Sequence, residues 1–298
     1  MVLLMKRALC IGLTVVLLVM LFIPLSLADG DSFINILLLG TDNFGYQQTG
    51  IGVDDEMSRA DAIYVISLHP ENKSIKLLSV ERDYLAVLPN GLGDNKLGTS
   101  TFFGGPEMAM DVVNEMFDLD IQLYAHIDIN KLISAIDIFG GVDVEILPEE
   151  IDGVNEFITG ILIEDVPLLA PGINHLNGMQ AWSLMGMREH DMDAIESNSE
   201  RNVRQQRVLT AILKQASEKD LSTLMVLVSE LLPLVTTNIS TAELIKLLEV
   251  ALSMSFDHID YQRTPAGSYK IKRVNMHRVV VPDNMEAEID LIHQFFSK

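Results

Sequence analysis

The feature that most constrains the fold is a short apolar run that ends in glycine. Residues Phe33 to Gly40 read FINILLLG, with almost none of the polar alternation of a strand that has one solvent-exposed face. A strand with apolar side chains at both odd and even positions is buried on both faces. We therefore expect an α/β fold in which helices cover both faces of a mixed central β-sheet.

Strand and helix patterns alternate after this run, with strands marked by β-branched residues and helices by a period near 3.6. The predicted strands are Ala62 to Leu68, Ile75 to Val80, Leu123 to Ile127 and Val142 to Ile146. The predicted helices are Pro106 to Phe117, Asn130 to Phe139, Asn177 to Met187, Glu200 to Lys214, Leu221 to Leu234, Thr241 to Met254 and Asn284 to Phe296.

Four further segments complete the expected organisation. Tyr46 to Ser58 is polar and contains glycine, which predicts a loop over the strand ends. Leu147 to Ile173 is predicted to be irregular, Glu189 to Ser199 is predicted to be a loop, and Tyr269 to Val281 is a basic, strand-like stretch. We expect one mixed α/β domain without internal repeats.

The composition excludes several classes of protein. The chain has 298 residues with 21 Lys and Arg against 42 Asp and Glu, a formal net charge of −21. Nucleic-acid binding needs a basic surface, so it is not expected. The single cysteine, Cys10, excludes an internal disulfide framework and a zinc site with four cysteine ligands.

The N-terminal residues predict a membrane anchor. Lys6 and Arg7 precede an uncharged run from Ala8 to Leu27, which at ~1.5 Å per residue can cross a ~30 Å hydrocarbon core. We expect residues 1–7 in the cytoplasm, a single transmembrane helix at 8–28, and residues 29–298 outside the cell membrane. The alternative is a signal peptide that is cleaved near Ala28, which would release a secreted protein.

Arginines are sparse in this acidic chain, and several lie beside carboxylates at strand ends. Arg59 and Asp61 are two residues apart where a strand begins, and Asp42 follows the preceding strand. Arginine suits phosphate, and paired carboxylates suit a hard cation such as Mg²⁺. If the two strands are neighbours, Asp42 and Asp61 can share a metal ion. The alternative is an exposed ion pair worth at most ~1 kcal/mol.

Other basic side chains are candidates for the same anion. Arg82 follows a buried strand, with Glu81 and Asp83 as alternative partners. Arg201, Arg204 and Gln205 lie at i, i+3 and i+4 and therefore share one helix face, which can equally pair with the protein's own acidic surface. Two further candidates are Lys96 and Arg188.

In their order along the chain, these motifs resemble the LytR-CpsA-Psr family of envelope proteins. The resemblance covers residues 35–215 and leaves a helical and mixed part at 216–298. The matching stretches are Ile36 to Asp42, Arg59 to Ala62, Leu78 to Asp83, Asn95 to Leu97, Phe103 to Gly105, Phe139 to Val142, Leu176 to Gly178 with Ala181, and Arg201 to Gln205.

The resemblance implies a phosphotransferase outside the membrane. Such an enzyme moves a glycopolymer, such as teichoic acid, from undecaprenyl-pyrophosphate to peptidoglycan, with Mg²⁺ or Mn²⁺ as cofactor. By resemblance, Asp42 and Asp61 are metal ligands and, with Arg59 and Arg82, the catalytic residues. The implied pyrophosphate ligands are Arg59, Arg82, Lys96, Arg188, Arg201, Arg204 and Gln205.

The chain departs from the family pattern at several positions. Glu81 stands where a proline is usual before Arg82, and Ser197 and Asn198 stand where glycine and aspartate are usual. Gly186 stands where the family usually has an arginine, and Glu200 adds an acid directly before Arg201, where a glycine is usual. Loss of one transition-state donor can lower a rate by ~10²–10³. The alternative function is therefore a polyprenyl-phosphate-binding paralogue with weak or no transferase activity.

Overall fold

The computed structural model describes residues 33–41, 59–160, 166–187, 194–240, 259–275 and 277–297, together with Met254. These residues form two compact units. The sheet unit comprises the described residues of 33–129 and 235–297, and the helical unit those of 130–234.

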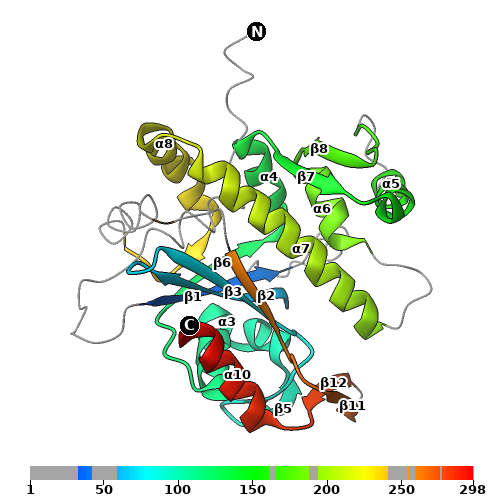
Figure 1. Ribbon diagram of the computed structural model, residues 1–298. Coiled ribbons are helices and arrows are strands. Elements are labelled where there is room, and N and C mark those ends of the chain that lie inside the picture. Colours follow the sequence, from blue (N-terminus) through cyan, green and yellow to red (C-terminus); the bar gives the residue numbers. More distant parts are fainter. Residues whose placement is uncertain are drawn as a thin grey trace. The chain divides into compact units, whose positions relative to one another are not determined.

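A six-stranded mixed sheet dominates the sheet unit, in the order β10-β3-β2-β1-β6-β9 (Figure 1). Its central pairs β1–β2 and β2–β3 are antiparallel, whereas β1–β6 and β3–β10 are parallel. The strands are β1 Ile34–Thr41, β2 Ala60–His69, β3 Ser74–Val80, β6 Leu123–Asp128, β9 Thr236–Thr237 and β10 Ile259–Thr264.

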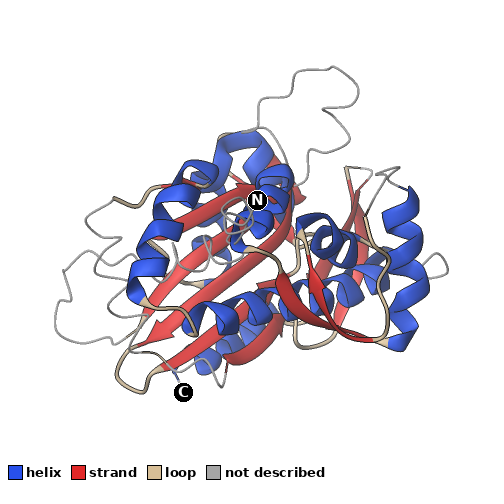
Figure 2. Ribbon diagram, turned by 90° about the horizontal axis from the view of Figure 1, so that it is seen from above, coloured by secondary structure: helices blue, strands red, loops and turns tan. Residues whose placement is uncertain are grey.

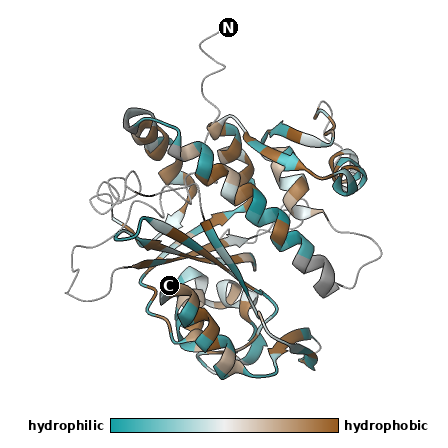
Figure 3. Ribbon diagram, viewed as in Figure 1, coloured by the Kyte–Doolittle hydropathy of each residue, from teal (hydrophilic) through white to brown (hydrophobic). Residues whose placement is uncertain are grey.

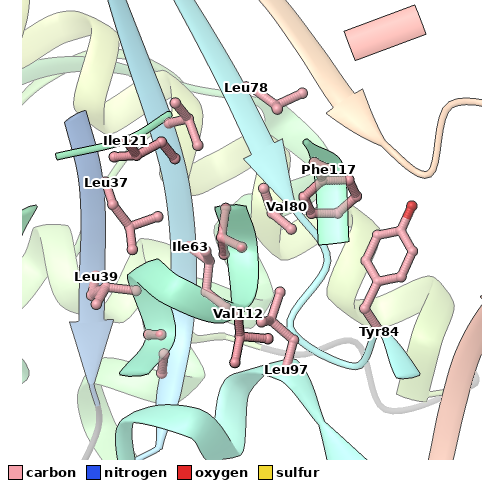
Figure 4. Close-up of a cluster of buried hydrophobic side chains, with 14 of the residues drawn as sticks. Leu37, Leu39, Ile63, Leu78, Val80, Tyr84, Leu97, Val112, Phe117 and Ile121 are labelled. Atoms are coloured by element: carbon pink, nitrogen blue, oxygen red, sulfur yellow. The ribbon is translucent and has the colours of Figure 1, made fainter. Parts of the chain in front are cut away.

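Two helices cover one face of this sheet. Helix α3 (Ser100–Phe117) and helix α10 (Met285–Ser297) bury their apolar side chains against β1, β2 and β3. Figure 4 shows the centre of this core, where Leu37 and Ile63 of the sheet lie near Val112 of α3 and Phe117 packs edge-on to Tyr84. Side chains on the opposite face, such as Ile66, are also fully buried. In Figure 3 the central strands have long brown stretches together with some teal positions, in keeping with the apolar run of β1.

Two short ribbons complete the sheet unit. Strands β4 (Leu85–Leu88) and β5 (Gly93–Lys96) form one antiparallel pair, and a 3₁₀ turn, η2 (Leu97–Thr99), connects them to α3. Strands β11 (Tyr269–Val274) and β12 (His277–Pro282) form the other.

The helical unit packs helices beside a two-stranded ribbon, β7 (Val142–Ile146) with β8 (Gly172–Leu176). Helix α7 contacts α6 and β7. Asn177 caps the first turn of α6, and its side chain accepts a hydrogen bond from the Gln180 amide. The helices are α4 Ile129–Phe139, α5 Ile151–Gly160, α6 Gly178–Gly186, α7 Ala194–Ser217 and α8 Leu221–Leu231, with 3₁₀ turns η3 Pro148–Glu150 and η4 Leu232–Leu234.

The mixed central sheet and its helices confirm the predicted mixed α/β class, while helices on the second face of the sheet and a preceding transmembrane helix stay predictions. Figure 2 shows the long strands, drawn red, among the blue helices. The predicted start of a helix at Pro106 is also recovered: Gly104 and Gly105 have non-helical backbone angles inside α3, so a helical segment begins again at Pro106.

Two local predictions are wrong. Leu147 to Ile173 is not irregular throughout, because Val154 and Ile158 are buried one turn apart and form α5. The predicted loop at Glu189 to Ser199 contains the start of α7.

Two strand predictions are confirmed with added detail. The strand-like stretch Tyr269 to Val281 forms two strands, because Asn275 turns the chain with a φ of 48°. The strand Val142 to Ile146 is β7, which pairs with β8.

Other predictions fall on residues outside the described ranges. These include the anchor at 8–28, the loop at Tyr46 to Ser58 and nearly all of the helix at Thr241 to Met254. In the described ranges, no helix is both long and apolar enough to span a membrane.

Candidate functional site

A β-bulge lies at Asp61, near the N-terminal end of β2 in the central sheet. Gly40 of β1 pairs with Ala62 of β2, but the next residue, Thr41, pairs with Ala60, so Asp61 is the extra residue on β2. Bulges redirect a side chain and are frequent beside active sites. The expectation that β1 and β2 are neighbours is confirmed, and the chain leaves β1 toward Asp42 directly beside the bulge.

Asp61 forms an ion pair with Arg82, which lies just after β3. An Nη1 donor of Arg82 bonds Oδ1 of Asp61, and both side chains remain partly exposed, at 20% for Arg82 and 26% for Asp61. Arg59, directly before β2, is exposed. The predicted grouping of Asp61 with Arg82 is therefore present in the sheet unit, with both partners within reach of solvent.

Gly98 locks the backbone around this pair. Its amide donates to the carbonyl oxygen of Arg82 over 2.8 Å. A Cβ at this position would lie 2.6 Å from the carbonyl oxygen of Ala60 and 3.2 Å from Cβ of Arg82. Thr101 also fixes this backbone, because its hydroxyl oxygen accepts a hydrogen bond from the amide of Ala60 over 2.9 Å. Sequence reasoning missed both residues, since a single glycine or threonine carries no visible signal of such contacts.

Lys96 lies on β5 and forms an ion pair with Asp83, the residue that follows Arg82. Its Nζ is 2.8 Å from Oδ1 of Asp83, and Arg82 Nε is 3.9 Å from the same oxygen. Asp83 is largely buried, so the two cations hold a carboxylate next to the Arg82–Asp61 pair. Arg82, Asp61, Asp83 and Lys96 thus form a continuous charged cluster, hereafter the strand-end cluster.

Buried polar groups fix the segment that carries Arg82. The amide of Glu81 donates to the carbonyl of Thr264 over 3.1 Å, and Tyr84 shares a 2.7 Å hydrogen bond with the Thr264 hydroxyl. Burial raises the pKa of Tyr84 well above its usual value, so this phenol stays protonated. Glu288 accepts hydrogen bonds from Thr264 and from two amides of the following turn.

In the helical unit, Arg201 and Arg204 lie on the buried face of α7, with Gln205 half-buried beside them. Arg204 donates from Nε to the carbonyl of Leu184 over 3.0 Å and from Nη2 to that of Met187 over 2.7 Å. It therefore satisfies carbonyls at the C-terminal end of α6 and fixes the backbone just before Arg188. The predicted contact of Arg204 with a pyrophosphate stays a prediction.

Arg207 is a partly exposed arginine of α7 that sequence reasoning did not select. Its two terminal nitrogens bond both carboxylate oxygens of Glu150 at 2.8 and 2.6 Å, and it also donates to the carbonyl of Glu145. Burial acts to raise the pKa of Glu150. The hydrogen bonds from Arg207 and the Leu147 amide outweigh it and hold that pKa below its usual value.

Two of the departures from the family pattern, Gly186 and Glu200, lie in the helical unit. Gly186 ends α6, and a Cβ there would meet Phe157 at 3.5 Å and Trp182 at 3.6 Å, which are ordinary contacts. Glu200 is exposed on α7. The structure therefore has room for a Cβ at Gly186.

The donor set of the strand-end cluster fits Mg²⁺ in part. Mg²⁺ is usually held by one or two carboxylates together with water and phosphate oxygens, and a carboxylate has enough lone pairs to accept Arg82 and also ligate a metal. Asp61 meets this requirement. The other predicted ligand, Asp42, lies outside the described residues, as does Arg188. In the described ranges alone, no group of three or more His, Cys, Asp or Glu is placed to hold a metal ion.

These features define a class of protein: a mixed-sheet α/β fold with an arginine–carboxylate cluster at a bulged strand end, suited to an anionic ligand. The chain belongs to the LytR_cpsA_psr family, whose sequence model matches residues 23–288. The family predicted from the ordered motifs is thereby confirmed.

Known proteins support this assignment. The chain is 30% identical over 185 residues to the polyisoprenyl-teichoic acid–peptidoglycan teichoic acid transferase TagU of Bacillus cereus (strain AH820), covering 62% of this chain and 53% of the relative. The matched region is thus about half the length of this curated relative.

Solved structures share the fold. B. subtilis TagT superposes with a TM-score of 0.67 at 20% identity, covering 91% of this chain and 93% of the other. The family protein YwtF (TagT) with bound octaprenyl pyrophosphate lipid gives 0.65 at 18% identity, covering 90% and 92%.

Proposed function

We propose that this protein is a phosphotransferase that moves a glycopolymer from undecaprenyl-pyrophosphate to peptidoglycan in cell wall assembly. The observation that carries the proposal is the strand-end cluster, in which a bulge presents Asp61 and Arg82 together. Support comes from family membership, from the transferase name of the B. cereus relative, and from the pyrophosphate lipid named in one similar structure.

The chemistry asks the protein mainly for positioning and charge stabilisation. Arg59 and Arg82 would bind phosphate oxygens through their planar donor sets. Lys96, held by Asp83, would add a positive charge beside them. On the family resemblance, Arg188, Arg201, Arg204 and Gln205 are further phosphate ligands. Asp42 and Asp61 would hold Mg²⁺, or Mn²⁺, which when bound neutralises charge on the pyrophosphate.

A transfer assay tests the proposal. The full chain, a polyprenyl-pyrophosphate-linked polymer and purified peptidoglycan should give a phosphodiester-linked product that requires Mg²⁺. Asp61→Asn should abolish most of this product, because the substitution removes a metal ligand and the carboxylate that holds Arg82. Asp94→Asn, an exposed acid on β5, is the matched control and should keep full activity. Unchanged transfer by Asp61→Asn would contradict the assignment.

Gly186 and Glu200 favour a second candidate, a polyprenyl-phosphate-binding paralogue with weak or no transfer. Gly186→Arg separates the two, since the structure leaves ordinary contact distances for the new Cβ. A gain of tenfold or more in transfer would mark a binding protein that has lost catalytic strength. Unchanged transfer would mean that a guanidinium at this position does not limit the enzyme.

We also propose that residues 8–28 anchor the chain, with residues 1–7 in the cytoplasm and the family domain outside. The uncharged run after Lys6 and Arg7 supports this topology. Intact-mass measurement of protein extracted from membranes distinguishes the alternatives. A mass that includes residues 1–28 supports an anchor, whereas a chain that begins near Asp29 in the culture medium supports a cleaved signal peptide.

A further inference from the structure

Strands β11 and β12 form a basic ribbon in an acidic protein. From Tyr261 to Pro282 the sequence has five Lys and Arg and no Asp or Glu, whereas the whole chain has 42 acids against 21 bases. The five are Arg263, Lys270, Lys272, Arg273 and Arg278. Such a segregation of charge creates a local positive potential that the rest of the surface does not share.

Four of these bases lie on the ribbon itself, because Arg263 belongs to β10, and the ribbon places two of the four against each other. Lys272 and Arg273 are exposed, and Arg273 lies directly opposite Arg278 in the antiparallel register. Like charges in directly opposed positions destabilise a strand pair by ~0.2–1 kcal/mol. Lys270 is paired with Asp283, 2.8 Å away, so Lys272 on one face of β11 and Arg273 on the other are the exposed bases best placed for an external anion.

Backbone contacts join the ribbon to the strand-end cluster within the same unit. The amide of Val280 donates to the carbonyl of Asp83 over 2.8 Å, and Val280 bridges to Tyr84. The side-chain amide of Asn275 donates to the carbonyl of Asp94 over 2.9 Å, two residues before Lys96. Val279 and Val280 are fully buried, so the ribbon is a fixed part of the sheet unit. It lies beside β5 in Figure 1.

We infer that the ribbon binds a linear polyanion of the phosphodiester class: the polymer part of the donor, held while its pyrophosphate end reaches the strand-end cluster. This inference rests on the proposed function. A thread-like anion suits a two-stranded ribbon whose strands are ~4.8 Å apart. A flat anionic membrane suits it less, because it would also bring the acidic surface of this −21 chain within a Debye length of ~8 Å.

Binding of fluorescent poly(glycerol phosphate) to the full chain in nonionic detergent tests the inference. Lys272→Gln/Arg273→Gln should weaken binding about tenfold and lower the salt dependence by on the order of one unit per charge removed. The matched control Lys73→Gln/Lys214→Gln removes two exposed lysines elsewhere and should bind like the wild type. Arg273→Lys keeps the charge on the ribbon and should retain most of the affinity.

Three results would overturn the inference. The first is equal affinity of the ribbon variant and the wild type, with circular dichroism showing both folded. The second is equal loss in the lysine control. The third is binding to phosphatidylglycerol vesicles that exceeds polymer binding and disappears in the ribbon variant, which would assign the ribbon to a membrane surface.

The transfer assay separates this inference from the proposed function. The ribbon variant should transfer a donor with a single repeat unit at the wild-type rate and lose several-fold only with long anionic donors. If wild-type protein binds poly(glycerol phosphate) through the ribbon yet transfers no donor, the proposed transferase function is wrong and polyanion binding by the ribbon is still supported.

Discussion

The two units each carry an ion-paired arginine, and the two pairs are built differently. In the helical unit, Arg207 grips both oxygens of Glu150 and a backbone carbonyl, and the Glu150 side chain is only 7% exposed. In the sheet unit, Arg82 contacts one oxygen of Asp61, and both side chains are partly exposed. An arginine with a closed set of partners supports the fold, whereas one on a bulged edge can exchange its partner for a ligand.

The largest expected effect is on stability, from Arg207→Met. Breaking the pair leaves the Glu150 side chain, which is 7% exposed, as a largely buried uncompensated charge. Because the Arg207 side chain is itself 21% exposed, the cost is at most the ~3–5 kcal/mol of a fully buried pair. Chemical denaturation should show this loss, while transfer per folded molecule stays near that of the wild type. The double variant Glu150→Gln/Arg207→Met should recover much of the stability, because no buried charge remains. A loss of unfolding free energy below ~1 kcal/mol would show that the Arg207–Glu150 pair behaves like an ordinary surface ion pair and does not differ from the Arg82–Asp61 pair.

Arg82→Gln should have the opposite profile. Transfer should fall by ~10²–10³, equivalent to ~2.7–4 kcal/mol of transition-state stabilisation. The free energy of unfolding should change by no more than ~1 kcal/mol, since the pair is partly exposed. Arg82→Lys keeps the charge but loses the planar fork, so it should restore only part of the rate. A large stability loss with normal specific activity would show that Arg82 serves the fold, as Arg207 does.

The units should also respond to acid over different pH ranges. Burial, together with the positive charge of Lys76, lowers the pKa of His69 on β2 to about 4. The unfolded chain binds this proton near pH 6.5, so stability present above pH 6.5 is lost as the pH falls to about 4, on the order of 3 kcal/mol. Glu150 has a lowered pKa, so its contribution is lost only below the usual glutamate value of 4.5.

Hydrogen exchange at pH 5 and pH 7 checks this order. Amides of β2 should lose protection at pH 5 while those of α5 and α7 keep it. His69→Gln should remove the difference for β2. Equal loss in both units at pH 5 would contradict the assignment of the acid sensitivity to His69.

Gly98 lies against backbone atoms of the strand-end cluster and should not tolerate a side chain. Gly98→Ala should destabilise the sheet unit by ~1–3 kcal/mol, since the new methyl group meets the Ala60 carbonyl oxygen at 2.6 Å and backbone has to move. Because Gly98 also holds the Arg82 carbonyl, transfer should fall as well. Thermal unfolding and the transfer assay measure the two effects. An unchanged melting temperature would show that the backbone absorbs the methyl group without strain.

Sequence patterns predicted the sheet better than the site. The apolar run at Phe33 to Gly40 was informative because strand periodicity and burial are local properties. The bulge at Asp61 depends on how β2 pairs with β1, which no single segment encodes. The contacts of Gly98 with Ala60 and Arg82 are likewise tertiary. Arg207 was missed because its partner, Glu150, is 57 residues away in a segment predicted to be irregular.

The smallest expected effect is at Gly186, the helical-unit counterpart of Gly98. Gly186→Ala should raise the free energy of unfolding by ~0.5–1 kcal/mol, because alanine loses less backbone entropy in a helix and its Cβ meets Phe157 and Trp182 at ordinary distances. Chemical denaturation of this variant beside Gly98→Ala should give shifts of opposite sign. If both variants lose stability, Gly186 is also a packing requirement. The absence of an arginine there would then reflect the fold of the helical unit and not a relaxed catalytic demand.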